Sequence, residues 1–380
     1  MQTHTHTLRS PATGTQRTLQ SLHFGSDRQR PDDSANANTQ KVYIQASLHA
    51  DELPGMLVAH HLRGLLTALE ASGALLGEVV LVPMANPIGL DQTLMYAQLG
   101  RFEMASGENF NRHYPDFANA IADAVAPQLS QDAAHNRQVI RAAMQEWLSQ
   151  QPTPNELASL RNTLMRLAAD ADVVLDLHCD FEAVMHLYVE TPYLDQAAPL
   201  AQALGARALL WAQNDSGALC FDESLSAVWW RLRARFPNHP IDLACLSSTV
   251  ELRGQADVSH AQAQADAQAI VDFLIHRGVI AGHVTLPQPV CAPTPLAGSQ
   301  TLHAPHAGVI SYHAQAGDTL AVGDVVADIV CPATAQVTPV VAEVDGVLYA
   351  RHVLRWATTG MDIGKIAGAK AFKTGPLLSA

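Results

Sequence analysis

The chain has 380 residues, which is enough for one large domain and a smaller one. Its hydrophobic content of 48% is typical of a globular chain with a sizeable core, and no apolar stretch approaches the ~20 residues that a membrane span needs. The formal net charge of -13 argues against nucleic acid as a partner, although a small anionic substrate can still bind where an acidic protein is locally basic.

The N-terminus and the cysteines favour a cytoplasmic location. The first residues lack the basic start and apolar core of a secretory signal peptide. The five cysteines are odd in number and scattered, and none are spaced as C-x-x-C. This pattern fits a reducing compartment better than a disulfide framework. The composition leaves the oligomeric state open, so a homo-oligomer is compatible with the sequence.

The first three quarters of the chain predict strands that alternate with helices. A polar, turn-rich loop is expected over residues 26–40, before the first core strand. The further expected elements, in chain order, are strand 42–48, helix 54–70, strand 78–83, an irregular segment over 91–117, helix 155–169, strands 173–177 and 185–189, helices 200–208 and 227–236, strand 248–252, and a helix from Ser259 to about His276. Such alternation predicts an α/β fold with a mixed, mostly parallel sheet and helices on both faces.

The sequence changes character after about residue 280. Four prolines between residues 287 and 295 indicate a linker, and short Val-rich strands with Gly-Asp turns follow it. This pattern predicts a small all-β domain that resembles the barrel-sandwich fold of biotinyl and lipoyl carriers. No lysine occupies the turn that a carrier would modify, so the resemblance is architectural. We place the large domain at residues 1–285 and the β domain at residues 286–380.

Three potential metal ligands follow predicted strands. His49 and Glu52 share one turn after the strand at 42–48, and His178 follows the strand at 173–177. Open α/β sheets bind ligands at the carboxyl ends of their strands, where these side chains can meet. Two imidazoles and one carboxylate are a typical set of protein ligands for a catalytic zinc. A lone histidine is more often an ordinary core or loop residue, but the combination favours a metal site.

Glu251 lies inside the apolar strand at 248–252, where an unpartnered carboxylate is energetically costly. Beside a metal-bound water it would act as a general base. Strand alternation puts Arg253 on the same face. An ion pair with Arg253, or simple exposure to solvent, is therefore the main structural alternative for Glu251.

Three residues of the irregular segment favour an anionic group in the substrate. Asn111 and Arg112 are adjacent, and an amide beside a guanidinium can hold a carboxylate through planar, paired hydrogen bonds. Arg101 can neutralise an oxyanion. Each residue taken alone is compatible with an ordinary surface loop.

Four short motifs together carry a resemblance to a known family. They are HADE (residues 49–52), ENFNR (108–112), DLH (176–178) and VEL (250–252). In this order and spacing, the chain resembles the succinylglutamate desuccinylase/aspartoacylase family of the zinc carboxypeptidase superfamily, over roughly residues 15–280. An appended β domain is also usual in that family.

The resemblance implies a zinc-dependent amidohydrolase that removes the acyl group from an N-acyl amino acid or a similar small amide. It implies one Zn²⁺ ion per chain, bound by His49, Glu52 and His178. It also implies roles for four further residues: Glu251 in activating water, Arg101 in stabilising the oxyanion, and Asn111 and Arg112 in holding the substrate carboxylate.

Two positions depart from the family pattern, and two other functions stay open. Ala50 stands where the family often has glycine, and Asn109 stands where it often has aspartate, which weakens any orienting role toward a ligand histidine. A metallocarboxypeptidase acting on short peptides would use the same residues. A non-catalytic binding protein would keep the fold without the reaction.

Overall fold

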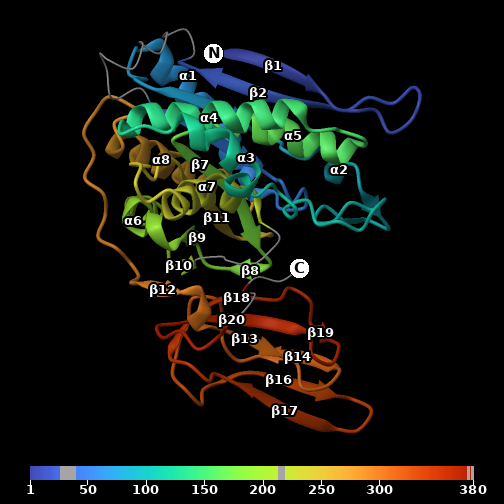
Figure 1. Cartoon of the computed structure of the whole chain (residues 1–380). Coiled ribbons are helices and arrows are strands. Elements are labelled where there is room, and N and C mark those ends of the chain that lie inside the picture. The colour runs from blue at the N-terminus through green and yellow to red at the C-terminus, as the bar shows by residue number, and fades with distance from the viewer. Residues whose placement is uncertain (26–39, 213–218, 375–376, 378–380) are drawn as a thin grey trace.

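The computed structural model describes residues 1–25, 40–212, 219–374 and 377 (Figure 1). A nine-stranded sheet forms the centre of the N-terminal part, and two antiparallel sheets form the C-terminal part. Residues 26–39 of the predicted loop lie outside the described residues.

The central sheet has the strand order β1-β2-β4-β3-β7-β11-β9-β10-β12. Its strands are β1 (Gln2–Thr7), β2 (Thr18–Phe24), β3 (Lys41–Ala46), β4 (Glu78–Val82), β7 (Val173–Asp180), β9 (His186–Glu190), β10 (Ala208–Ala212), β11 (Leu246–Gly254) and β12 (Pro293–Pro295). Strands β4, β3, β7 and β11 are neighbours and run parallel to one another. Strand β11 is antiparallel to its other neighbour, β9, and β2 is antiparallel to both β1 and β4. The predicted mixed, mostly parallel sheet is confirmed.

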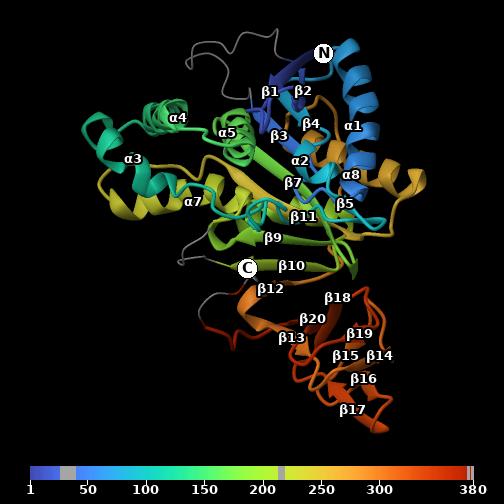
Figure 2. The same ribbon diagram turned by 90° about the vertical axis from the view of Figure 1, so that its right-hand side faces the viewer.

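Two layers of helices cover the two faces of this sheet (Figure 2). One layer holds α1 (Pro54–Ala71), α6 (Leu194–Leu204) and α8 (His260–His276), and the other holds α3 (Phe117–Val125), α4 (Ala133–Gln150), α5 (Glu156–Ala168) and α7 (Phe221–Arg235). Alternate residues of β3 divide between the two cores, with Ile44 in the first and Tyr43 in the second. Burial on both faces explains why the central strands read as unbroken apolar runs.

Some elements differ from the predicted bounds. Strand β1 was not expected because nearly all of its residues are exposed, so it carries no apolar signal. Helix α4 was not expected because only a narrow stripe of it is buried. The helix expected at 200–208 instead spans Leu194–Leu204, because Gly205 ends it in the left-handed region at φ 63°, and β10 then begins at Ala208.

The segment between β4 and α3 is irregular, as predicted. It contains the short helix α2 (Pro87–Leu90) and two short strands, β5 (Thr93–Leu94) and β6 (Ala97–Gln98), which pair only with each other. An isolated bridge between Phe102 and Asn109 folds the rest of the segment back on itself.

The C-terminal part is all-β, as predicted. One sheet comprises β13 (Ser299–His303), β20 (Asp362–Gly368), β18 (Gly346–Arg351) and β15 (Thr319–Leu320), and the other comprises β17 (Gln336–Val341), β16 (Val325–Cys331), β14 (Gly308–Tyr312) and β19 (Trp356–Ala357). A short strand of the N-terminal part, β8 (Glu182–Ala183), pairs with β18 and joins the two parts. The boundary at residues 285 and 286 stays a prediction, and β12 beyond it still pairs with β10.

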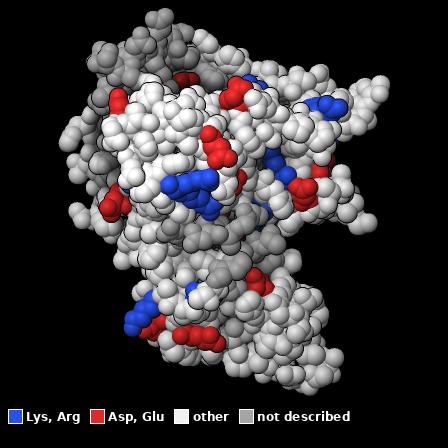
Figure 3. Space-filling view, viewed as in Figure 1, with Lys and Arg blue, Asp and Glu red and all other residues white. Residues whose placement is uncertain are grey.

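Among the described residues, no helix combines the length and the apolar character that crossing a bilayer would require. On the face shown in Figure 3, the described Lys and Arg residues are scattered among Asp and Glu residues and form no large basic patch.

Candidate metal centre

A cavity of about 250 Å³ lies between the carboxyl ends of the central strands and the C-terminal part. All seven residues that the sequence singled out line it: His49, Glu52, Arg101, Asn111, Arg112, His178 and Glu251. The position agrees with the rule that open α/β sheets bind ligands beyond the carboxyl ends of their strands.

His49 and Glu52 lie on a tight turn between β3 and α1. The Ser47 backbone is in the left-handed region at φ 59°, and its hydroxyl donates a hydrogen bond of 2.8 Å to the Glu52 carbonyl. The Ala50 amide donates to the Gly100 carbonyl at 3.0 Å, which ties the turn to the irregular segment. Ala50, one of the two departures from the family pattern, is fully buried in this contact.

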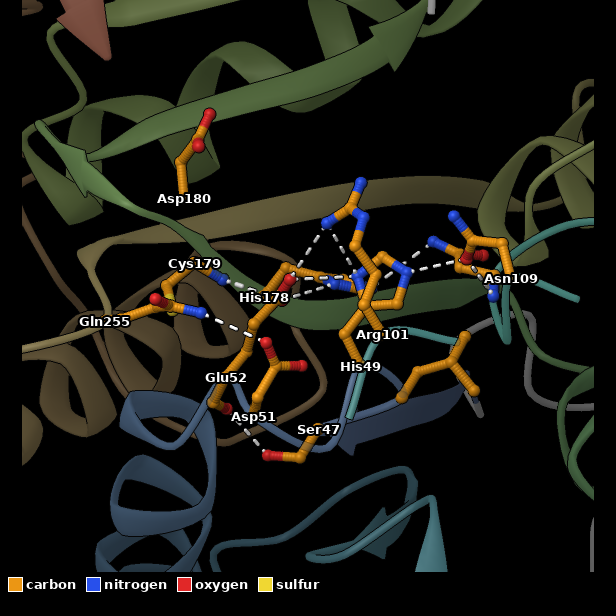
Figure 4. A network of polar contacts seen from close by, with 12 residues as sticks. Ser47, His49, Asp51, Glu52, Arg101, Asn109, His178, Cys179, Asp180 and Gln255 are labelled. Carbon is orange, nitrogen blue, oxygen red and sulfur yellow. Dashed lines mark hydrogen bonds and ion pairs between the residues drawn. The ribbon is translucent and has the colours of Figure 1, made fainter. Parts of the chain in front are cut away.

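The three potential ligands converge on one point (Figure 4). His49 Nδ1 lies 2.9 Å from Glu52 Oε1, and His178 Nδ1 lies 2.7 Å from Glu52 Oε2. The ligand atoms of all three residues lie within 4.8 Å of one another, and each side chain is buried. Two ring nitrogens and one carboxylate in this arrangement fit a zinc-type ion with an open coordination position.

The outer ring nitrogens of both histidines face oxygen atoms. The Asn109 Oδ1 atom accepts a hydrogen bond from the Asn111 backbone amide at 2.9 Å, so the atom facing His49 is the amide oxygen. His49 Nε2 then donates to this oxygen at 2.9 Å, which leaves the lone pair on Nδ1. His178 Nε2 lies 3.0 Å from Asp176 Oδ2. Such contacts fix the ring orientation of metal-binding histidines.

The three potential ligands shift one another's pKa values in the absence of an ion. Burial lowers the pKa of His49. Burial acts in the same direction on His178, but the carboxylates of Asp176 and Glu52 outweigh it and raise the pKa of His178 well above the ordinary value. Burial acts to raise the pKa of Glu52, but the two histidines outweigh it and hold that pKa far below its usual range. A bound cation would take the place of the proton that the cluster otherwise shares.

Arg101 reaches the same point from the irregular segment. Its Nη1 atom lies 3.4 Å from His49 Nδ1 and 3.5 Å from Glu52 Oε1 (Figure 4). The Phe110 amide donates to the Arg101 carbonyl at 3.1 Å beside the bridge between Phe102 and Asn109, so one fold of the chain positions Arg101 next to residues 109–112.

Asn111 and Arg112 lie where the irregular segment meets α7. Asn111 Oδ1 accepts a hydrogen bond of 2.9 Å from the Phe221 amide, and Asn111 Nδ2 lies 3.4 Å from His178 Nε2. Arg112 Nη1 donates to the Asn111 carbonyl at 2.7 Å and to Cys220 Sγ at 3.2 Å. Asn111 is therefore adjacent to His178, and both Asn111 and Arg112 line the cavity.

Glu251 lines the cavity and, among the described residues, forms no ion pair with Arg253. It is half-buried, and its Oε2 atom is shielded from solvent and has no hydrogen-bond partner among the described residues. Burial, with a contribution from the Glu52 charge, raises the pKa of Glu251 to about 8. Arg253 pairs with Asp266 of α8 through Nη1 and Oδ1 at 3.2 Å. An irregularity after Glu251, with Arg253 at φ 64°, breaks the strand alternation that suggested an ion pair.

Several cavity residues were not singled out in the sequence. Lys365 and Arg351 come from the C-terminal part, where Lys365 Nζ donates to Asp180 Oδ2 at 2.8 Å and Arg351 Nε donates to Glu182 Oε2 at 2.6 Å. Nothing in their local sequence indicates that they meet residues of the N-terminal part. Glu190 also lines the cavity, and it ends an apolar strand, which is the kind of signal that identified Glu251.

Comparison with known proteins identifies the family of the chain. Residues 38–277 match the family model for the succinylglutamate desuccinylase/aspartoacylase catalytic domain. A succinylglutamate desuccinylase/aspartoacylase family protein from Shewanella amazonensis is 27% identical, with a TM-score of 0.83 over 97% of this chain and 98% of that one. A second, from Shewanella frigidimarina, is 26% identical, with a TM-score of 0.82 over 96% of each chain.

A more distant structure and a search of curated proteins complete the comparison. An ectoine utilization protein from Ruegeria pomeroyi is 16% identical, with a TM-score of 0.65 over 95% of this chain and 92% of that one, a likeness that concerns the fold alone. No curated protein matches the chain. Because the family model covers well over half of its length, the chain belongs to the succinylglutamate desuccinylase/aspartoacylase family.

Proposed function

We propose that this protein is a zinc-dependent amidohydrolase that removes the acyl group from an N-acyl amino acid. The observation that carries the proposal is the convergence of His49, Glu52 and His178 in a cavity that Glu251 also lines. Members of this family are hydrolases that act on small molecules, which fits the size of the cavity.

His49, Glu52 and His178 would hold the ion through the two Nδ1 atoms and the carboxylate. Zinc, when bound, supplies a Lewis acid that polarises the amide carbonyl and acidifies water. The contacts of Asn109 and Asp176 with the outer ring nitrogens keep both lone pairs directed at the ion.

Glu251 would move the proton of the reaction. Its Oε2 atom is unpartnered among the described residues. Burial raises its pKa to about 8 without an ion, and a bound cation would lower that pKa toward neutral pH, where Glu251 can both accept and release a proton. It takes the proton from the attacking water as the new C–O bond forms. It then delivers that proton to the amide nitrogen as the C–N bond breaks. The products are a carboxylate and a free amine.

Three cationic or polar side chains would hold the negative charges of the substrate. Arg101, whose Nη1 atom is 3.5 Å from Glu52 Oε1, stabilises the oxyanion that develops on the carbonyl. Arg112 and Asn111 bind the carboxylate of the amino acid at the end of the cavity next to α7.

The C-terminal part favours small substrates over peptides. Lys365 and Arg351 come from the C-terminal part and line the cavity, where Lys365 pairs with Asp180 of β7 and Arg351 pairs with Glu182 of β8. A peptide bound as a carboxypeptidase substrate would have to extend past these two ion pairs. We therefore favour the deacylase over the metallocarboxypeptidase.

A substrate panel tests the proposal. The zinc-loaded protein is assayed on N-acetyl and N-succinyl amino acids beside dipeptides and tripeptides of matched C-terminal residues. We expect hydrolysis of the acyl amino acids at least tenfold faster, in kcat/KM, than hydrolysis of the peptides. Faster turnover of the peptides would favour the carboxypeptidase. No hydrolysis of either class would favour a binding protein.

Two further assignments belong to the proposal. We assign residues 286–380 to a second domain, which contributes Arg351 and Lys365 to the lining of the cavity. The protein is cytoplasmic, which its five free cysteines support.

A further inference from the structure

A chain of three buried polar side chains runs behind His178. Tyr43, Gln45 and Asp176 are all fully buried. The Tyr43 hydroxyl donates a hydrogen bond of 2.8 Å to Gln45 Oε1, and Gln45 Nε2 donates one of 2.9 Å to Asp176 Oδ1. The other oxygen of Asp176 lies 3.0 Å from His178 Nε2, whereas His178 Nδ1 faces Glu52. The chain therefore ends at the ring nitrogen that does not face the proposed ion.

The register of the central sheet places these side chains together. Gln45 of β3 and Asp176 of β7 are register partners on adjacent parallel strands. Tyr43 lies two positions before Gln45 on β3, and His178 lies two positions after Asp176 on β7. Side chains two positions apart on a strand point to the same face of the sheet. The chain from Tyr43 to His178 is therefore built by two strands, and no loop takes part in it.

The hydrogen bonds of this chain have one consistent direction. An ionised Asp176 only accepts hydrogen bonds, so Gln45 presents its amide nitrogen to Asp176 and its amide oxygen to the Tyr43 hydroxyl. Among the described residues, Gln45 is the only side chain that donates to Asp176 Oδ1, and Oδ2 has no contact partner besides His178. Gln45 is therefore the side chain that holds the carboxylate behind the imidazole ring.

An ordinary structural role accounts for only part of this arrangement. A buried hydroxyl needs a partner, which explains why Tyr43 contacts Gln45. It does not explain the carboxylate, because Asp176 pairs with no Lys or Arg side chain of the described chain and a buried charge is costly. The contact with His178 explains the carboxylate, and the carboxylate in turn explains Gln45.

We propose that Gln45 and Tyr43 are positioning residues of the metal centre, which act on the ion through Asp176 and His178. The proposal rests on the proposed function, because it requires His178 Nδ1 to bind the ion. Gln45 fixes the plane of the Asp176 carboxylate so that Oδ2 faces the imidazole, and Tyr43 fixes the amide of Gln45. The ring of His178 is then held with Nδ1 directed at the ion.

Zinc affinity tests the proposal without any assay of turnover. Competition with a chromophoric chelator gives the zinc affinity of the parent protein and of two variants. Gln45→Met keeps the length of the side chain but cannot donate to Asp176, and it should weaken zinc binding about tenfold, the low end for residues that support a metal ligand. Tyr43→Phe removes one neutral hydrogen bond and should weaken binding roughly threefold.

Two control variants remove matched buried groups elsewhere. Gln300 is a buried glutamine of β13, and the buried Tyr193 donates its hydroxyl to the Ser226 carbonyl at 2.8 Å. Neither Gln300 nor Tyr193 lines the cavity. Gln300→Met and Tyr193→Phe should therefore lose stability in denaturant titrations but keep the parental zinc affinity. An equal loss of zinc affinity in the controls would overturn the proposal, because the effect would then be general destabilisation.

The cobalt-loaded protein adds a spectroscopic readout. The visible bands of bound Co²⁺ should shift in Gln45→Met, because His178 is held less firmly, and should stay unchanged in Gln300→Met. Unchanged bands in Gln45→Met, or zinc affinities no weaker than the parental value in both Gln45→Met and Tyr43→Phe, would overturn the positioning role and leave the metal centre intact. A parent protein that binds zinc but hydrolyses no acyl amino acid would reject the reaction and keep the positioning role. A parent protein that binds no zinc would reject both.

Discussion

His178 of β7 and Glu251 of β11 are register partners on adjacent parallel strands. Side chains at paired positions of neighbouring strands lie on the same face of the sheet, about 4.8 Å apart along the hydrogen-bonding direction. The sheet itself therefore holds the proposed base beside a proposed metal ligand, and no loop has to order to bring them together.

Replacing the base without changing its size tests this arrangement. Glu251→Gln should lower kcat by roughly 10²–10⁴-fold, because the amide cannot accept the proton of the attacking water. KM and zinc content should change little, since Glu251 is not among the three converging ligands. Steady-state kinetics with metal analysis of the same sample checks both. Hydrolysis at the parental rate would remove Glu251 from the mechanism.

The raised pKa of Glu251 predicts the pH dependence of the reaction. Only the ionised carboxylate accepts a proton, so kcat/KM should rise with pH as Glu251 ionises. Burial and the Glu52 charge move its pKa from the ordinary 4.5 to about 8, and a bound cation pulls it part of the way back. The acidic limb of the kcat/KM profile should therefore lie between these two values. An acidic limb with an apparent pKa at or below the ordinary value of 4.5 would contradict the assignment of Glu251 as the base.

Asn109 predicts a change in metal affinity. Its Oδ1 atom accepts a hydrogen bond of 2.9 Å from His49 Nε2, but the side chain carries no charge. Asn109→Asp should tighten zinc binding because a carboxylate makes the imidazole a better ligand, whereas Asn109→Ala should weaken it roughly 10–100-fold. Competition with a chromophoric chelator measures both. Identical affinities in the three proteins would show that the contact does not orient His49.

Glu190 predicts a pH-dependent loss of stability. Its pKa is about 8 in the folded protein against an ordinary 4.5, so the folded state binds the proton more tightly than the unfolded state. The free energy of unfolding from this group therefore falls as pH rises from about 4.5 to about 8. The Glu190→Gln variant cannot ionise at this position. Its free energy of unfolding should therefore fall by roughly 2–4 kcal/mol less than that of the parent protein over that pH range. Denaturant titrations at pH 5 and pH 8 compare the two proteins, and parallel losses in both would refute the prediction.

The proposed metal ligands and the proposed base could be singled out in the sequence because they are polar residues that follow or interrupt apolar strands. His49 follows one such strand, and Glu251 lies within another. Glu190 ends an apolar strand in the same way, but no partner motif marked it, and only the structure shows that it shares the cavity with Asp222.

Other features depend on the three-dimensional fold. The alternation rule placed Arg253 beside Glu251, but the irregularity in β11 turns Arg253 toward Asp266. The contact of Lys365 with Asp180 joins residues 185 positions apart, and local sequence carries no sign of it. Helix α4 escaped prediction because its buried stripe is narrow.

Metal analysis of the purified protein tests the central claim most directly. The protein is measured by mass spectrometry for bound divalent metals, as isolated and after incubation with Zn²⁺, beside His178→Ala and the exposed-site control His283→Ala. We predict one zinc ion per chain in the parent and in His283→Ala, and loss of that ion in His178→Ala. A parent protein that contains no divalent metal and gains none on incubation would contradict the account.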